Sequence, residues 1–155
     1  MKIIKRIAYS LIIIGLYFTL WRPARAYLME NTIVPIVTYA VGNGDNGLKF
    51  EKYNSVSIKL VQNHVSDQGN GMYLLKFPLG LFFLMGCVAL AVAGSDIKYY
   101  GWLLLVHLCC GLLSLFFVFL AAEGLTVMLN GSRFIFKIIL PIASIAMLLF
   151  AMQDT

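Results

Sequence analysis

The chain has 155 residues, of which 61% are hydrophobic and only 12% are charged. Its mean hydropathy of +0.86 lies far from the balance of a water-soluble globular domain and excludes an ordinary soluble fold. The formal net charge of +5 is scattered along the chain instead of being gathered in one basic tract. We therefore expect contact with anionic membrane lipids and no nucleic-acid partner.

The amino-terminal segment predicts a first transmembrane helix. The apolar run Ile7–Trp21 follows a basic start, and the aliphatic stems of Lys5 and Arg6 extend it toward the roughly 20 residues that cross a bilayer. A cleaved signal peptide is the alternative, because Ala24–Ala26 forms a small-x-small cleavage pattern. We favour an uncleaved anchor over residues 1–26, since bulky and charged residues separate the apolar run from that pattern.

Residues 27–76 form a more polar insertion that begins with an amphipathic segment. Tyr27–Val41 either continues the first helix or lies along the membrane interface. Pro35 is expected to kink or restart any helix there. Gly42–Gly47 is rich in Gly and Asn and predicts a plain turn.

The second part of the insertion predicts a β-hairpin. Ser55–Leu60 alternates polar and apolar residues, and turn residues at Asp67–Gly71 precede a second candidate strand, Gly71–Phe77. Leu48–Tyr53 is a candidate third strand. One face of the first strand carries three apolar side chains that must be covered, Val56, Ile58 and Leu60. We favour cover by the chain's own helices; a protein partner is the alternative, which makes these three residues candidates for partner docking.

Residues 77–155 predict a transmembrane bundle of three helices. Its long apolar runs are Phe77–Gly94, Gly101–Ala122 and Phe134–Met152. The predicted fold is an α-helical integral membrane protein with four transmembrane helices and a small extracytoplasmic insertion, containing the β-hairpin, between helices one and two. The basic residues before the first helix place the amino terminus in the cytoplasm.

One helix of this bundle carries the candidate site. His107, Cys110, Gly111 and Ser114 follow helical spacing and share a face. Small residues allow helices to approach closely, and an intramembrane His is costly unless it is bonded or functional. We interpret the face as a packed helix interface in which His107 bonds a neighbour's carbonyl or hydroxyl. The alternative is a ligand or proton site lined by Cys110 and Ser114.

The sequence offers no catalytic motif. Its three cysteines, Cys87, Cys109 and Cys110, lie in apolar runs without a C-x-x-C pair. H-E-x-x-H, G-x-S-x-G and phosphate-loop patterns are absent from the chain. We therefore expect a protein that is not an enzyme and that has neither a cofactor nor a metal site.

A family resemblance adds a functional expectation. The helix entry Phe77-Pro-Leu-Gly-Leu-Phe-Phe83, the polar link Ser95–Tyr100 and the segment Trp102–His107 resemble the small membrane proteins that accompany exosortases in bacteria. The resemblance covers Phe77–Ala122 and carries over no functional residue. It implies an accessory to a protein-sorting or export system of the cell envelope.

These observations lead to one preferred function and one alternative. We expect a noncatalytic accessory or assembly subunit, a multi-pass protein of the bacterial inner membrane beside a larger integral membrane partner. The alternative is a membrane protein centred on His107 that binds a small ligand or handles protons.

Overall fold

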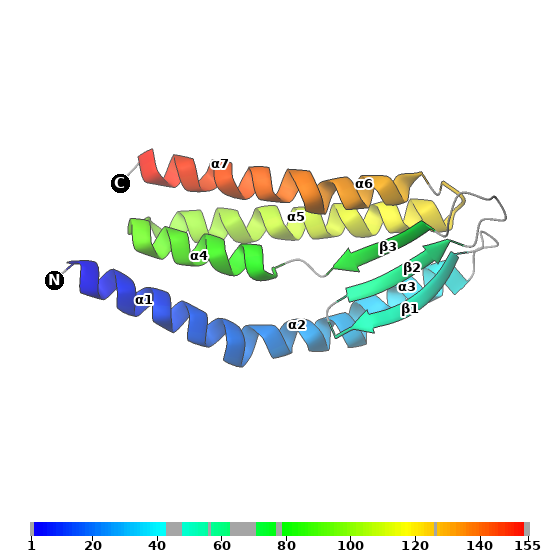
Figure 1. The fold of residues 1–155 in the computed structure, drawn as a ribbon, viewed down its shortest axis with the longest axis horizontal. Coiled ribbons are helices and arrows are strands. Elements are labelled where there is room, and N and C mark those ends of the chain that lie inside the picture. The colour runs from blue at the N-terminus through cyan, green and yellow to red at the C-terminus, as the bar shows by residue number, and fades with distance from the viewer. Residues whose placement is uncertain are drawn as a thin grey trace.

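The structure is a computed structural model that describes residues 2–42, 48–55, 57–62, 71–76, 79–125 and 127–153. Its long axis follows the helices, and a small sheet lies beside them toward one end (Figure 1). The first helix is continuous over Ile3–Gly42. It comprises α1 (Lys2–Leu16), the π-helical turn η1 (Tyr17–Trp21), α2 (Arg22–Leu28), a second π-helical turn η2 (Met29–Ile33) and α3 (Val34–Gly42).

Three strands and three further helical segments follow. The strands are β1 (Leu48–Asn54), β2 (Ser57–Gln62) and β3 (Gly71–Lys76). The helices are α4 (Leu81–Ala93), α5 (Ile97–Ala122) and a last helix that joins α6 (Met128–Phe134), the π-helical turn η3 (Ile135–Ile139) and α7 (Leu140–Gln153).

Within the described ranges, three helices are long and apolar enough to cross a membrane: Ile3–Gly42, Ile97–Ala122 and Met128–Gln153. This agrees with the predicted helical membrane protein. The remaining apolar helix, α4, has 13 residues and would extend only about 20 Å.

Each π-helical turn precedes a proline by the same interval. The turns end at Trp21, Ile33 and Ile139, and the prolines follow two residues later, at positions 23, 35 and 141. A proline has no backbone N–H and its ring clashes with the carbonyl four residues earlier; a wider turn relieves that clash. The helix therefore runs through Pro35, and of the two alternatives for Tyr27–Val41 the structure has the continued first helix.

The π-helical turns also keep one side of the first helix facing the protein. From Tyr17 onward its buried residues recur at multiples of four: Tyr17, Arg25, Met29, Val37 and Val41. In a regular α-helix a spacing of four drifts by about 40° at each step. The extra residue in each π-helical turn offsets much of that drift, so the buried side stays aligned over 25 positions.

The three strands form an antiparallel sheet in the order β1-β2-β3. Ile58 and Leu60 on the central strand are 0% and 1% exposed. They pack with Leu75 of β3 against buried residues of the helices, namely Met29, Val37, Val41, Val118, Ala121, Ala122 and Leu129. We call this sheet and the helical segments that cover it the head.

The chain itself thus covers the apolar face of the sheet, as the preferred interpretation expected. Apolar burial gives the reason: about 25 cal/mol is gained for each Å² of apolar surface removed from water, and α3, α5 and α6 supply the cover. In this structure Ile58 and Leu60 are therefore not exposed to a partner, which corrects their assignment as docking candidates. Val56 lies outside the described residues.

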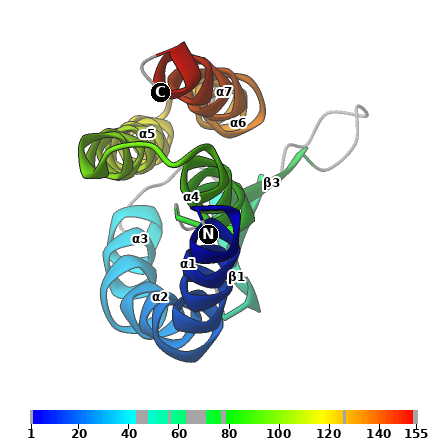
Figure 2. The same cartoon turned by 90° about the vertical axis from the view of Figure 1, so that its left-hand side faces the viewer.

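The helices away from the sheet form a bundle in which α4 is central. It contacts α1, α5 and α7, and the view along the long axis places it between α1 and the pair α5 and α7 (Figure 2). The two chain termini lie at the same end, opposite the head (Figure 1). The longest single α-helix, α5, takes part in every buried cluster: through Leu103 and Cys110 in the bundle and through Val118 in the head.

Candidate functional site on the buried face of α5

His107 lies at the centre of this face and is fully buried, at 0% exposure. Its Nδ1 atom lies 2.9 Å from the carbonyl oxygen of Leu103, one turn earlier on the same helix. A carbonyl can only accept, so Nδ1 carries the proton and donates it, and Nε2 is left as an acceptor. Within the described part of the chain, that buried Nε2 atom has no hydrogen-bond partner.

The bond of His107 differs from the one expected from the sequence, which was to a neighbouring helix. What α4 contributes instead is an aromatic contact. The Phe83 ring meets the imidazole edge to face, with a centroid separation of 5.3 Å and an interplanar angle of 70°. Phe83 also lies beside Trp21, at a ring separation of 6.3 Å. The imidazole is therefore held by its own helix and contacted by one aromatic ring of α4, which in turn lies beside Trp21 of the first helix.

The other predicted residues of the face are also buried, but they do not join His107 in one polar cluster. Cys110 packs with Ile135 and Leu140 of the last helix. Ser114 is 0% exposed and forms a hydrogen bond with the hydroxyl of Ser132 on α6. Gly111 is buried between them. The face points into the protein, and among the described residues its one hydrogen bond between hydroxyl groups joins α5 to α6.

A second buried polar group lies on the first helix. Arg25 is only 7% exposed, and its Nη1 atom donates a hydrogen bond of 3.0 Å to the hydroxyl of Tyr17. One turn away on the same side, Trp21 Nε1 donates to the carbonyl oxygen of Leu79 at 3.2 Å. Both side chains therefore hold the segment where the chain enters α4.

That entry contains a backbone conformation that L-residues seldom adopt. Leu79 has φ +64° and is buried, and such a position persists only where the surroundings fix it. The hydrogen bond from Trp21 is one such constraint. The Arg25 guanidinium is another, because its Nη2 atom lies 3.4 Å from the place where a Cβ on Gly80 would be.

Close packing between α4 and α5 fixes the carbonyl that holds His107. A Cβ on Gly86 would lie 2.7 Å from Cδ2 of Leu103, so the helices approach as closely as a glycine permits. Leu103 itself is 0% exposed. The residue that accepts the His107 bond therefore has little room to move.

Sequence reasoning missed Tyr17, Trp21, Arg25 and Ser132. The first three recur at intervals of four, which is a usable signal only once the π-helical turn among them is known. Ser132 lies 18 residues from Ser114, and its pairing depends on how the last helix docks on α5. Neither relationship follows from local spacing.

The chemical capacity of this face is narrow. A neutral imidazole with an available Nε2 lone pair can accept a hydrogen bond or a proton. In the part of the chain that the structure describes, no group of three His, Cys, Asp or Glu side chains could hold a metal ion. Cys87 and Cys110 are buried free thiols, and Cys109 is an exposed one.

Comparison with known proteins assigns no relative: no protein-family model, curated protein or solved structure matches the chain.

Proposed function

We propose that this protein is a noncatalytic accessory or assembly subunit of a bacterial cell-envelope complex, and that it works by holding its head in a fixed place at the membrane surface. The participation of α5 in every buried cluster is the observation that carries this proposal. Because one continuous helix belongs to both the bundle and the head, the two parts are joined rigidly. A head that is held rigidly suits a protein that positions a partner by contact.

The lengths of the helices support a membrane slab around the bundle alone. The first helix has 40 residues and would extend about 60 Å, twice the roughly 30 Å of hydrocarbon in a bilayer. From α2 onward it carries Arg22, Arg25 and Glu30, whereas residues 7–21 before α2 have no charged residue. The first half therefore spans, and α2 and α3 continue beyond the membrane with the sheet.

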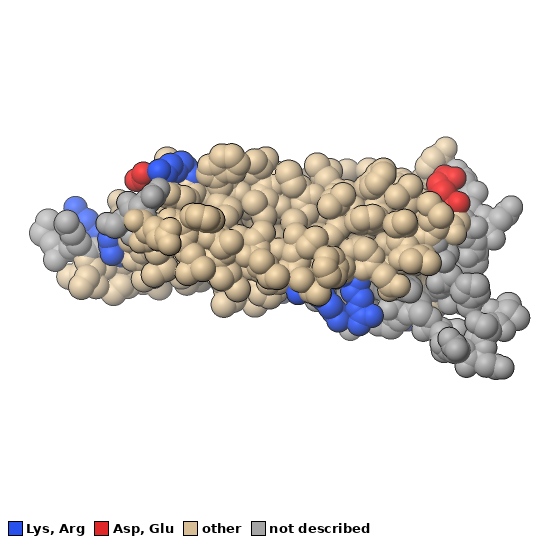
Figure 3. Space-filling view, turned by 90° about the horizontal axis from the view of Figure 1, so that it is seen from above, with Lys and Arg blue, Asp and Glu red and all other residues tan. Residues whose placement is uncertain are grey.

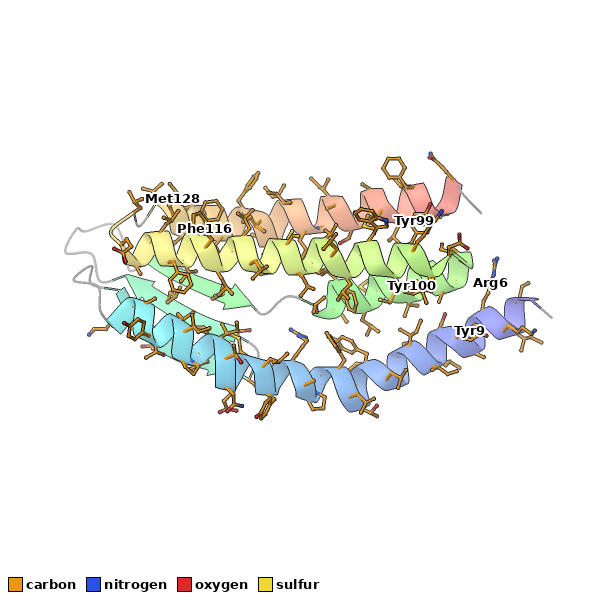
Figure 4. All side chains as sticks on the ribbon, turned by 180° about the vertical axis from the view of Figure 1, so that it is seen from behind. Arg6, Tyr9, Tyr99, Tyr100, Phe116 and Met128 are labelled. Atoms are coloured by element: carbon orange, nitrogen blue, oxygen red, sulfur yellow. The ribbon has the colours of Figure 1, made fainter. Side chains whose placement is uncertain are left out.

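Aromatic and basic side chains mark one boundary of that slab. Arg6, Tyr9, Tyr99 and Tyr100 lie together toward the end where the chain begins, whereas Phe116 and Met128 lie toward the head (Figure 4). Tyr residues gather at membrane interfaces because the ring is apolar and its hydroxyl is polar. This end is the proposed cytoplasmic side, and the head is extracytoplasmic.

The short helix α4 serves as the fourth span in this arrangement. Its 13 residues cover about two thirds of the hydrocarbon, so the nonhelical entry at Leu79 and Gly80 lies at the head-side edge of the hydrocarbon, level with Trp21. Irregular backbone is tolerated at such depth only where protein covers it. Trp21 and Arg25 provide that cover through the contacts described above.

The larger partner is proposed to be an integral membrane protein of an exosortase-type sorting or export system. This follows the resemblance over Phe77–Ala122. The surface offered to it is the outer side of the sheet, where Glu51 and Lys59 form a cross-strand ion pair of 2.8 Å. Lys49 is exposed on the same strand as Glu51.

Crosslinking in native membranes tests this function. A photoreactive residue at Lys49 is expected to capture one partner in stoichiometric amount, and a residue at the lipid-exposed Leu112 serves as the control. Reversal of the pair, Glu51→Lys with Lys59→Glu, should reduce capture and impair envelope sorting together. A chain that is recovered alone from membranes in which it is fully functional overturns the proposal.

The buried acceptor atom of His107 favours one second candidate, a site for a small ligand or a proton. Buried polar groups are nearly always hydrogen-bonded, whereas the Nε2 atom of His107 has no partner among the described residues. A bound ligand or a proton would supply that partner. Under this alternative, His107→Gln abolishes the cellular phenotype while crosslinking from Lys49 is unchanged. Under the accessory function, that substitution leaves sorting intact at equal expression.

A further inference from the structure

The last helix carries two adjacent basic side chains on an otherwise apolar surface. Arg133 and Lys137 are four residues apart, so they lie on one side of the helix. Both are exposed, and among the described residues neither forms an ion pair. Exposed apolar side chains surround them in the sequence, with Phe134 at 51% and Ile138 at 43% exposure. Two like charges at this spacing repel each other unless an anion lies between them.

The depth of this pair matches the proposed far boundary of the membrane. Arg133 lies 19 residues before Met152, and on the first helix Arg22 lies 19 residues after Ile3. Both intervals correspond to about 28 Å along a helix, close to the hydrocarbon thickness. Lys137 lies one helical turn deeper in the membrane than Arg133. Its long side chain can extend back to the level of Arg133 by snorkelling.

Contacts between the helices also place Lys137 and Arg22 at similar depths, and this evidence does not depend on helix length. Ile135 and Leu140, which flank Lys137, pack with Cys110 of α5. One turn before Cys110, His107 meets Phe83, and Phe83 lies beside Trp21, the residue before Arg22. The space-filling view shows a broad uncharged face with one group of basic side chains along its edge and another near the end where the chain begins (Figure 3).

We propose that Arg133 and Lys137 bind the phosphate of an anionic phospholipid headgroup in the leaflet next to the head. An arginine fork and a lysine ammonium converge on phosphate oxygens by charge-assisted hydrogen bonds. The exposed apolar neighbours accommodate the acyl chains. The site fixes the depth of the last helix and thus the height of the head above the bilayer. This inference rests on the proposed membrane placement, and not on the accessory role.

Native mass spectrometry of the full chain in mild detergent, titrated with phosphatidylglycerol, tests the site. The Arg133→Gln/Lys137→Gln variant is expected to bind the lipid about thirty-fold more weakly, from roughly a fivefold loss for each of the two charges. The matched control is Lys49→Gln/Lys59→Gln, which removes the same two charges from the sheet and should bind like the parent. Arg133→Lys should retain most of the affinity, since the charge is kept.

Three results would overturn the lipid site. The first is equal affinity in the parent and the Arg133/Lys137 variant, and the second is an equal loss in the control variant, which indicates attraction to net charge alone. The third is saturation of the same pair by inorganic phosphate at concentrations that match the lipid, which indicates a soluble anion as the ligand.

A depth measurement separates failure of the site from failure of the membrane placement. The chain has two tryptophans, so Trp102→Phe leaves Trp21 as the only indole. Quenching by lipids brominated at different acyl positions should place Trp21 near the headgroups. Deep quenching at the bilayer centre refutes the placement itself; shallow quenching with unchanged lipid affinity refutes the headgroup site alone.

Discussion

Gly86 and Leu103 form the closest approach between α4 and α5: a Cβ on Gly86 would lie 2.7 Å from Cδ2 of Leu103. Leu103 packs in a cluster with Cys87, Leu90 and Ala151, so its side chain cannot turn away freely. This one contact joins the short central helix to the longest one. It also fixes the backbone carbonyl to which His107 donates.

Gly86→Ala is therefore expected to destabilise the protein by about 1–3 kcal/mol, the usual consequence of overpacking a close interface. Chemical unfolding in mixed micelles measures the effect. Gly101→Ala is the matched control, because a Cβ there meets nothing within 4 Å and alanine favours a helix by roughly 1 kcal/mol. Equal stability of the two variants would refute the close contact.

Gly94→Ala is expected to destabilise by about 1–2 kcal/mol for two reasons. Gly94 has φ +77° at the carboxyl end of α4, where glycine has no steric penalty. An added Cβ would also lie 2.3 Å from Nη2 of Arg6, whose cation complements the negative end of the helix. In a double-mutant cycle, Arg6→Gln should therefore matter less in the Gly94→Ala chain than in the parent. Strictly additive effects would show that the two residues do not interact.

The hydrogen bond between Ser114 and Ser132 is expected to stabilise the docking of α6 on α5 by about 1 kcal/mol. Ser114→Ala and Ser132→Ala should each lower the unfolding free energy by that amount. The double variant should lose clearly less than the sum, because no buried hydroxyl is then left without its partner. Unfolding in micelles provides the values, and a double variant that loses the full sum contradicts the pairing.

His107→Leu is expected to leave stability unchanged or to raise it by about 1 kcal/mol. The substitution removes a buried acceptor that has no hydrogen-bond partner among the described residues, and burial of such a group is unfavourable. Thermal unfolding followed by circular dichroism measures this change. A stabilised variant that loses its cellular phenotype would identify His107 as a functional residue kept at the expense of stability. A strongly destabilised variant would mean that Nε2 is satisfied in the native membrane.

Thiol labelling is expected to distinguish the head from the membrane-embedded half of the first helix. Tyr39 and Leu11 are both well exposed on that helix, at 74% and 64%, but only Tyr39 lies beyond the proposed boundary. An impermeant maleimide added to intact spheroplasts should label Tyr39→Cys and leave Leu11→Cys at the background set by the parent cysteines. Labelling of Tyr39→Cys only in inverted vesicles would reverse the proposed orientation.

The broad class of the protein follows from composition, because long apolar runs are stable as helices in lipid and few other structures are. The run Gly101–Ala122 accordingly corresponds to α5, which begins four residues earlier at Ile97. The last run, Phe134–Met152, lies within the helix that begins at Met128. Such ends are set by polar residues and turns, whose effect on a helix is weaker than that of hydropathy.

Two features of the head and of the candidate site depended on tertiary structure. Ile58 and Leu60 had to be covered by something, and only the fold shows that α3, α5 and α6 cover them. The face of His107, Cys110, Gly111 and Ser114 was evident from helical spacing, but its actual partners, Leu103, Phe83 and Ser132, depend on how the helices dock.

The first helix illustrates the division most clearly. Its sequence by itself determined an apolar first half and a more polar second half, because lipid and water select residues by transfer free energy. Only the tertiary structure decided that both halves form one helix and that its buried residues from Tyr17 to Val41 are spaced by multiples of four. The physical reason is that the π-helical turns before Pro23 and Pro35 alter the helical period, and a pattern based on 3.6 residues per turn cannot reveal a face that such turns realign.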